Sequence, residues 1–411
     1  MWKMLRENRD IRLLFVAQVV SYLGDWFTFV ALAGMVEDAT GSKFLVSLVM
    51  VAFSLPSFLA SPIAGPAADR YDRKKLLVFV SLLQAGAALG LVASDESRIW
   101  MVFVFQSAIS ALAAFIRPAS EAALPNLARN DEELNRANSL LGATWGVMLA
   151  VGAGLGGLFA QTFGRTASFV ADVVSFVVAG ALFAAIGGRM QEERASSATR
   201  SRMRPLADMR EAVRLAQHDK VILALVASKA TFAIGAGIVS QLAVLASDVF
   251  KAGDAGRGLL IGVRGVGSGL GPLIASRLVK GELRRILFVC GIAGLLFSVF
   301  YMGAAASPNI AIAAACVALA HFGGGAQWTL SSYGLQLRSP DAVRGRVLAG
   351  DFAIVTLMLS ITSAASGLLA DAIGVRATIA LFAGAAACAS AAYLVLTGPI
   401  RRSLHIEPQH R

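Results

Sequence analysis

Twelve long apolar stretches constrain the fold of this chain more than any other feature. The hydrocarbon core of a bilayer is about 30 Å thick, and a helix needs roughly 20 mostly apolar residues to cross it. The stretches lie at approximately 11–36, 44–68, 75–94, 99–117, 137–161, 166–188, 220–247, 257–279, 285–306, 309–336, 345–371 and 375–397. We therefore predict an all-α integral membrane protein with twelve transmembrane helices.

The composition agrees with this prediction. Of the 411 residues, 56% are hydrophobic and 15% are charged, and the mean hydropathy is +0.67. A soluble domain carries roughly 25% charged residues. The three cysteines, at 290, 316 and 388, lie singly in apolar stretches and have neither disulfide nor metal-site spacing, so we expect no metal site. The first stretch is too long for a signal-peptide core, so no cleavable signal is expected.

The basic residues alternate between the two sides that the spans define. The side holding both termini carries 29 Lys and Arg, whereas the other side carries 6. Because Lys and Arg favour cytoplasmic loops, both termini are predicted to be cytoplasmic. The net charge of +11 is then a topology signal, and no nucleic-acid partner is expected.

The two halves of the chain resemble each other. Gly65-Pro66 recurs 206 positions later as Gly271-Pro272, and "GLFAQTFGRTA" from Gly157 resembles "GLLADAIGVRA" from Gly367, 210 positions later. Such repeats are typical of two-lobed secondary transporters. We predict two pseudo-symmetric six-helix bundles. The predicted parts are an N-terminal lobe at 1–188, a cytoplasmic linker at 189–219, a C-terminal lobe at 220–397 and a cytoplasmic tail at 398–411.

The stretch "GPAADRYDRKK" between the second and third spans is similar to the loop signature of the major facilitator superfamily. It is carried here by Gly65, Asp69, Arg70, Arg73, Lys74 and Lys75. The sequence of this loop also resembles sequences of the macrolide-efflux and enterobactin-exporter branch. Two further segments share the resemblance, "RPASEAALPNLARNDEELNRANSL" from Arg117 and "RGRVLAGDFAIV" from Arg344. That resemblance implies a proton-driven exporter of drugs or siderophores in a bacterial cytoplasmic membrane.

One stretch departs from the family pattern. Antiporters of this superfamily often carry Gly-Pro-x-x-Gly-Gly in the fifth span, but this chain reads "GAGLGG" from Gly152, with Ala153 in the place of proline. Antiport therefore does not follow from this segment. Its small residues still predict close helix approach.

The resemblance further implies a gate at the cytoplasmic face. In the family, the aspartate at position 69 meets the N-terminus of the eleventh helix, which is expected to begin near Gly345. Arg70 and Arg73 are then expected to pair with acidic groups of neighbouring helices, with Gly65 and Asp351 nearby. The alternative is a basic loop that serves only topology.

Asp25 lies halfway along the first predicted helix. A charged residue there costs about 2.5–3.5 kcal/mol on insertion scales, so a function is expected. We predict that Asp25 carries a proton in exchange for a cationic substrate, with Tyr22 and Trp26 beside it in the substrate cavity. Lys229 and Arg264 are cavity residues and candidate partners of Asp25. For Arg264 the alternatives are an anionic substrate or an ion pair with Asp248 or Asp172. A structural hydrogen-bonded role for Asp25 is the alternative.

Polar and aromatic residues in the tenth span complete the predicted cavity. They are His321, Gln327 and Trp328, which suit a bulky amphipathic ligand, although a lone histidine in an apolar stretch is more often a hydrogen-bonded packing residue. The acidic residues at the outer helix ends are expected to be solvated caps. These are Glu37, Asp38, Asp248 and Asp371.

These observations predict a function by elimination and by chemistry. No phosphate-binding loop, HExxH or GxSxG occurs, so we expect no enzyme, no catalytic residues and no cofactor, with the proton gradient as energy source. We predict a monomeric alternating-access exporter of amphipathic small molecules, with the substrate, protons and membrane lipids as partners. The same fold leaves open a lysophospholipid or divalent-metal transporter. A receptor or scaffold would not need Asp25 and Arg264.

Overall fold

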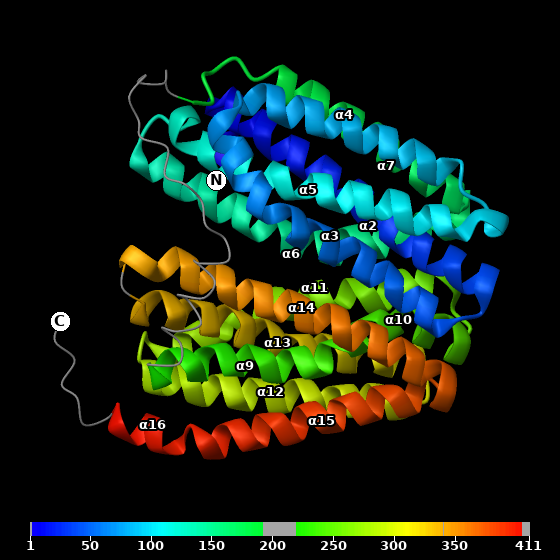
Figure 1. The fold of residues 1–411 in the computed structure, drawn as a ribbon, viewed down its shortest axis with the longest axis vertical. Helices are drawn as coiled ribbons and strands as arrows, with labels where there is room; N and C mark the ends of the chain where they lie inside the picture. The colour runs from blue at the N-terminus through cyan, green and yellow to red at the C-terminus, as the bar shows by residue number, and fades with distance from the viewer. Residues whose placement is uncertain (1, 192–218, 340, 405–411) are drawn as a thin grey trace. The chain divides into compact units, whose positions relative to one another are not determined.

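The computed structural model describes residues 2–191, 219–339 and 341–404. Within these ranges the chain is helical throughout and contains twelve helices long and apolar enough to cross a membrane, which confirms the predicted fold class (Figure 1). Most of the predicted linker and the end of the predicted tail lie outside the described residues.

The elements follow the predicted spans closely. They are α1 (Trp2–Glu7), α2 (Arg9–Thr40), α3 (Lys43–Arg70), α4 (Arg73–Val92), η1 (Glu96–Arg98), α5 (Ile99–Leu127), α6 (Asp131–Phe163), α7 (Arg165–Ala184), α9 (Lys220–Ala236), η2 (Gly237–Ser240), α10 (Gln241–Val244), η3 (Leu245–Val249), α11 (Gly253–Val279), α12 (Leu283–Ala306), α13 (Ile310–Arg338), α14 (Asp341–Ile373), α15 (Val375–Leu396) and α16 (Gly398–Ser403).

Several helices extend beyond their apolar stretches because backbone hydrogen bonding continues until a capping residue ends it. The helix of the fifth predicted span, α6, begins six residues before the predicted start of that span. Asn130 precedes its first turn, and the Asn130 side chain accepts a hydrogen bond from the Glu133 amide at 2.9 Å. An N-cap of this kind fixes where the helix starts.

The chain divides into two compact units. Unit 1 is Met1–Gly41, Leu48–Arg202 and Gly253–Leu259, and unit 2 is Ser42–Ser47, Met203–Ala252 and Leu260–Arg411. In unit 1, α2 packs against α6 and α7, and α4 packs against α5 and α7. In unit 2, α9 packs against α14 and α15, and α12 packs against α13 and α15. Each unit thus repeats one helix arrangement.

Glycines at equivalent positions show the repeat in detail. Gly164 separates α6 from α7 at φ 85° and ψ 160°, and Gly374 separates α14 from α15 at φ 85° and ψ 157°. The two residues are 210 positions apart, as in the sequence match. Only glycine adopts this backbone region at low cost, so both sharp connections depend on it.

The capping of α3 and α11 follows the same repeat. The Gln161 side chain of α6 accepts from the Ala255 amide at 3.0 Å, in the first turn of α11. At the matching position in α14, Asp371 accepts from the amides of Lys43 and Phe44, at 2.8 and 3.1 Å, in the first turn of α3. Asp371 is therefore a cap, as predicted, but of another helix.

The seventh span is interrupted, which the sequence analysis did not predict. After α9 the backbone passes through the 3₁₀ turn η2, the short α10 and the π turn η3. At the break, a side chain on Gly237 would lie 2.3 Å from the Thr362 carbonyl oxygen, so the backbones are in close contact. Ser366 donates to the Gly237 carbonyl at 2.9 Å and satisfies the interrupted backbone.

We expect Gly164→Ala to destabilise the protein by about 1–3 kcal/mol, because alanine would be held at a φ that L residues rarely adopt. No atom lies within 4 Å of the added methyl group, so the effect would come from the backbone alone. Thermal unfolding in detergent measures it. Gly146→Ala in α6 is the matched control, since its methyl also meets open space. An unchanged midpoint for Gly164→Ala would contradict the assignment.

Candidate functional site

Asp25 lies near the middle of α2 and is partly exposed. It makes no hydrogen bond and no ion pair with any residue in the described ranges. A carboxyl group without a partner in an apolar helix is costly to keep, and none of the described residues provides the hydrogen bond or ion pair of the structural alternative. Its chemistry remains available for taking up and releasing a proton.

A second carboxyl group, which the sequence analysis did not select, lies beside Asp25. Asp172 of α7 is fully buried and lies close enough to Asp25 to interact electrostatically. Thr28 donates to one Asp172 carboxylate oxygen at 2.8 Å and Ser175 donates to the other at 3.2 Å. The sequence itself could have identified Asp172, because this residue interrupts an apolar stretch just as Asp25 does.

The aromatic residues beside Asp25 differ in exposure. Tyr22 is partly exposed, one turn before Asp25. Trp26 is buried and packs against Phe29 and Phe53, with both ring centroids at 5.6 Å. Gly152 of α6 leaves room for this indole, since a Cβ there would lie 3.1 Å from the Trp26 Cβ. The structure thus gives Trp26 a packing role, whereas Tyr22 remains a candidate lining residue.

Lys229 of α9 and Asp351 of α14 form a buried ion pair in unit 2. The Lys229 Nζ also donates to Ser332 at 2.7 Å and lies 5.0 Å from the centre of the Trp328 ring. Lys229 was a candidate partner of Asp25, and Asp351 was expected beside the gate, with a structural role as the alternative. The structure instead uses each to neutralise the other, because a charge buried among apolar helices needs an opposite charge.

Gln327 of α13 is fully buried, contrary to the expectation that it lines a cavity. Its side-chain amide donates to the Ser228 carbonyl at 2.5 Å and to the Thr231 hydroxyl at 2.9 Å, both on α9. An amide in an apolar core is retained when its donors are bonded, so Gln327 joins two helices. Trp328, the next residue, is partly exposed.

Arg264 of α11 lies in a polar group with His321 of α13 and Tyr301 of α12. The Arg264 Nε donates to the His321 Nε2 at 3.2 Å, and the Tyr301 hydroxyl lies 2.8 Å from the same nitrogen. All three side chains are buried. Within the described residues Arg264 forms no ion pair, and its Nη1 has no hydrogen-bond partner.

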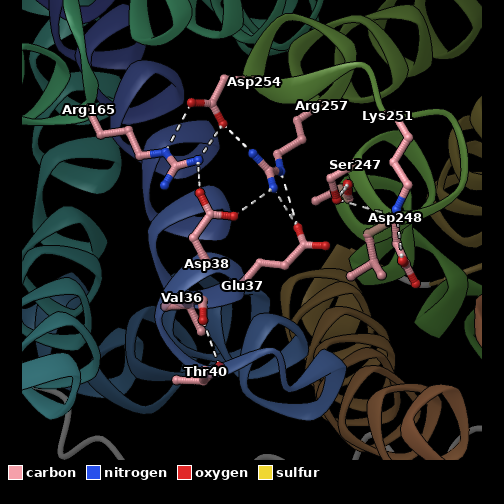
Figure 2. A network of polar contacts seen from close by, with 12 residues as sticks. Val36, Glu37, Asp38, Thr40, Arg165, Ser247, Asp248, Lys251, Asp254 and Arg257 are labelled. Atoms are coloured by element: carbon pink, nitrogen blue, oxygen red, sulfur yellow. Dashed lines mark hydrogen bonds and ion pairs between the residues drawn. The ribbon is translucent and has the colours of Figure 1, made fainter. Parts of the chain in front are cut away.

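An ion-pair network joins the end of α2 to the beginnings of α7 and α11 in unit 1 (Figure 2). Arg165 of α7 binds Asp254 of α11 through two hydrogen bonds, at 3.0 and 3.2 Å, and Asp38 of α2 at 2.7 Å. Arg257 of α11 binds Glu37 at 2.7 Å and also pairs with Asp254. Glycine at position 34 gives this network its room, since a Cβ there would lie 2.5 Å from Asp254.

The network corrects the expectation that Glu37 is a solvated cap. Only 13% of the Glu37 side chain is exposed, and 3% of the Arg257 side chain. Asp38, with 52% of its side chain exposed, fits the expectation better although it too pairs with Arg165. The two arginines that gather these carboxylates come from helices far apart in sequence, so a reading of α2 alone could not find the network.

The loop after α3 holds unit 1 together in a way that differs from the prediction. Arg73 was expected to pair with acidic groups, but it donates to backbone carbonyls, those of Ala68 at 3.3 Å, Ala122 at 2.7 Å and Met190 at 3.0 Å. Of these, the Ala68 carbonyl lies in the last turn of α3, where carbonyls lack helical partners and carry partial negative charge that an arginine satisfies. Lys74 likewise donates to the Ile186 carbonyl at 2.7 Å.

The other predicted gate residues are Gly65, Asp69 and Arg70. Gly65 lies within α3, and a Cβ there would meet no atom within 4 Å. Arg70 is exposed at the end of the helix. The Asp69 side chain lies outside the described residues, so its role in a gate stays a prediction.

The predicted close approach in the "GAGLGG" segment is confirmed within unit 1. A Cβ on Gly156 would lie 2.9 Å from the Phe27 Cα of α2, and one on Gly157 would lie 2.4 Å from the Asp254 carbonyl oxygen of α11. The small residues thus allow α6 to contact the backbone of two helices.

Residues 2–409 match the family described as "Transmembrane secretion effector". The chain belongs to this family of the major facilitator superfamily. The family match covers nearly the whole chain, and so confirms the resemblance that the loop signature indicated.

Individual relatives are more distant. YjbB, an uncharacterized MFS-type transporter of Bacillus subtilis, is 24% identical over 98% of both chains. Macrolide efflux protein A of Streptococcus pyogenes is 24% identical over 88% of this chain and 90% of the relative. The match to YfiS of Bacillus subtilis, at 28% identity, covers 44% of this chain and 41% of the relative.

Solved structures share the fold. A nucleoside transporter superposes with a TM-score of 0.74 at 10% identity, covering 93% of this chain and 99% of that one. A bacterial homologue of the lysosomal transporter Spinster gives a TM-score of 0.67 at 13% identity, over 95% and 97% of the two chains. At such identities the likeness shows the fold alone.

Lys229→Met is expected to destabilise the protein by about 3–5 kcal/mol, because it leaves Asp351 charged, buried and unpaired. The double variant Lys229→Met/Asp351→Leu should recover most of the loss, since it removes both charges. Thermal unfolding in detergent measures both, with exposed Lys75→Met as control. If the double variant were no more stable than the single one, the pair would not explain the effect.

Arg257→Gln is expected to lower the unfolding midpoint, because Glu37 and Asp254 would lose their shared cation while remaining partly buried. The loss should be about 3–5 kcal/mol and should change little with salt, since buried pairs are weakly screened. Exposed Arg98→Gln provides the control. A midpoint equal to that of Arg98→Gln would show that the network does not stabilise unit 1.

Proposed function

We propose that this protein is a proton-coupled exporter of amphipathic small molecules in the cytoplasmic membrane of a bacterium. The observation that carries the proposal is Asp25, partly exposed in the middle of an apolar helix and without a hydrogen bond or ion pair to any described residue. Family membership supports transport, and the names of relatives such as macrolide efflux protein A and multidrug efflux pump Tap of Mycolicibacterium fortuitum support export. Tap matches only 37% of this chain, at 31% identity.

Asp25 suits proton coupling because its protonation is not opposed by a partner. Where a carboxylate is held by a cation, as Asp351 is held by Lys229, adding a proton means breaking a buried ion pair. Asp25 has no such constraint among the described residues, and partial exposure gives protons access. The neighbouring Asp172 is already bonded by Thr28 and Ser175, so we assign it the supporting role.

We further propose that transport occurs by alternating access, with a fixed orientation of the protein in the membrane. The two units open in turn to the two sides of the membrane, with both termini in the cytoplasm as the distribution of Lys and Arg indicates. The loop residues Gly65, Asp69 and Arg70 remain the proposed gate, with Arg73 holding the loop in place. A lysophospholipid or divalent-metal transporter of the same fold is the alternative, and no group of three potential metal ligands occurs among the described residues.

We expect Asp25→Asn to abolish transport driven by a pH gradient, because asparagine cannot take up a proton, while substrate exchange without a gradient continues. Proteoliposomes loaded with drug, lysophospholipid and divalent-metal panels provide the measurement, and the substrate moved by the unmodified protein identifies the class. Exposed Asp95→Asn is the matched control. Gradient-driven transport by Asp25→Asn at the unmodified rate would refute proton coupling at this residue.

A further inference from the structure

Arg264 presents a positive charge that no described residue neutralises. Only 8% of the residue is exposed, and it forms no ion pair with any residue of the described ranges. Its Nη1 atom is buried without a hydrogen-bond partner. Buried charges elsewhere in unit 2 are paired, as Lys229 is with Asp351, so this guanidinium stands apart.

The residues around Arg264 cannot supply the missing negative charge. An arginine nitrogen only donates, so the His321 Nε2 that it contacts must be the unprotonated acceptor of the ring. The Tyr301 hydroxyl, at 2.8 Å, then also donates to that nitrogen. Both groups are neutral in this arrangement. The cluster orients the guanidinium but leaves its charge uncompensated.

Close helix packing holds Arg264 in this position. A Cβ on Gly267 would lie 2.1 Å from the Ala318 carbonyl oxygen, and one on Gly271 would lie 2.0 Å from that of Phe322. These two glycines, four residues apart on α11, let its backbone touch that of α13, the helix that carries His321. Small residues at this spacing allow such contact. The site is therefore built into rigid helices.

A row of aromatic rings leads away from the cluster within unit 2. Tyr301 contacts Phe297 at 4.7 Å, Phe297 contacts Phe232 at 5.0 Å and Phe232 contacts Trp328 at 6.1 Å between ring centroids. Trp328 in turn contacts Phe352 at 6.4 Å. Phe297 is fully buried, but Phe232 and Trp328 are partly exposed and Phe352 is exposed. The row thus offers apolar ring surface beyond the cation.

We propose that Arg264 binds the anionic group, a carboxylate, of an amphipathic substrate whose aromatic or apolar body lies along Phe232 and Trp328. When the packing over this buried atom opens during the transport cycle, a carboxylate would supply the negative charge and accept from Nη1. Guanidinium–carboxylate bonds are among the strong hydrogen bonds of proteins. The inference rests on the proposed function in that the bound anion is the exported molecule. It replaces the cationic substrate that Asp25 alone suggested.

The charge of the substrate determines how much net charge crosses the membrane in each transport cycle. Exchange of one entering proton for one leaving monoanion moves two positive charges inward per cycle, whereas exchange for a monocation moves none. The membrane potential, negative inside a cell, would then drive the anion exchange together with the proton gradient.

Binding tests the site directly. Naphthaleneacetate and its uncharged amide, naphthaleneacetamide, share one aromatic body, and their dissociation constants can be measured by calorimetry with the full chain in nanodiscs. We expect Arg264→Gln to weaken carboxylate binding about tenfold or more and to leave amide binding unchanged. Arg264→Lys should retain part of the preference. Exposed Arg277→Gln, on the same helix, should bind as the unmodified protein does.

Several results would overturn the inference: a carboxylate bound no more tightly than the amide, an equal loss for both probes in Arg264→Gln, or no binding of either. An equal loss of affinity for both probes would show that Arg264→Gln disturbs the whole site, and the amide probe makes such a loss visible. Unchanged carboxylate binding by Arg264→Gln would overturn it as well.

A transport assay distinguishes a failure of this inference from a failure of the proposed function. In proteoliposomes whose transporters have their termini outward, with an acidic interior, naphthaleneacetate uptake should accelerate when potassium and valinomycin make the interior positive. Uptake of a naphthylmethyl-trimethylammonium cation in its place, at a rate unaffected by the potential, would refute the anion site while proton-driven export stands. Arg264-dependent carboxylate binding without any gradient-driven transport would refute the proposed function and leave the site.

Discussion

A charged or hydrogen-bonding side chain inside an apolar helix must find a partner on another helix, and this constraint orders each unit of the protein. Lys229 and Asp351 join α9 to α14, and Thr28 with Asp172 joins α2 to α7. Apolar side chains pack equally well in many registers, whereas a buried charge tolerates few positions of its partner. The polar contacts therefore fix which helices are neighbours and at what height they meet.

Against this background, Asp25 and Arg264 are informative because they break the rule. One is a carboxyl group without a bond in the described residues, and the other is a guanidinium without a counter-charge. Asp25 belongs to unit 1 and Arg264 to unit 2. The proposed division of labour follows from this chemistry, since a lone carboxyl group can take a proton and a lone guanidinium can take an anion.

The internal repeat supplies the scaffold on which this asymmetry is built. Gly164 and Gly374 have the same backbone conformation, and Gln161 and Asp371 cap helices at equivalent positions. The charges that we assign to function do not repeat. At 206 to 210 positions after Asp25 the chain offers no acidic residue, nor does any basic residue stand at the equivalent of Arg264 in the first half. The two units thus share an architecture but not these charges.

The sequence alone determined the twelve helices, the two-fold repeat and the family, because each depends on patterns along the chain: apolar length, glycine and proline spacing, and the loop signature. It also identified Asp25 and Arg264, since a charge in an apolar stretch is visible without a structure. Only the tertiary structure decided the partners. It paired Lys229 with Asp351, turned Arg73 toward backbone carbonyls and buried Gln327 between helices. Each of these partners lies on another helix, so the pairing depends on which helices meet and in what rotation, and no single segment contains that information.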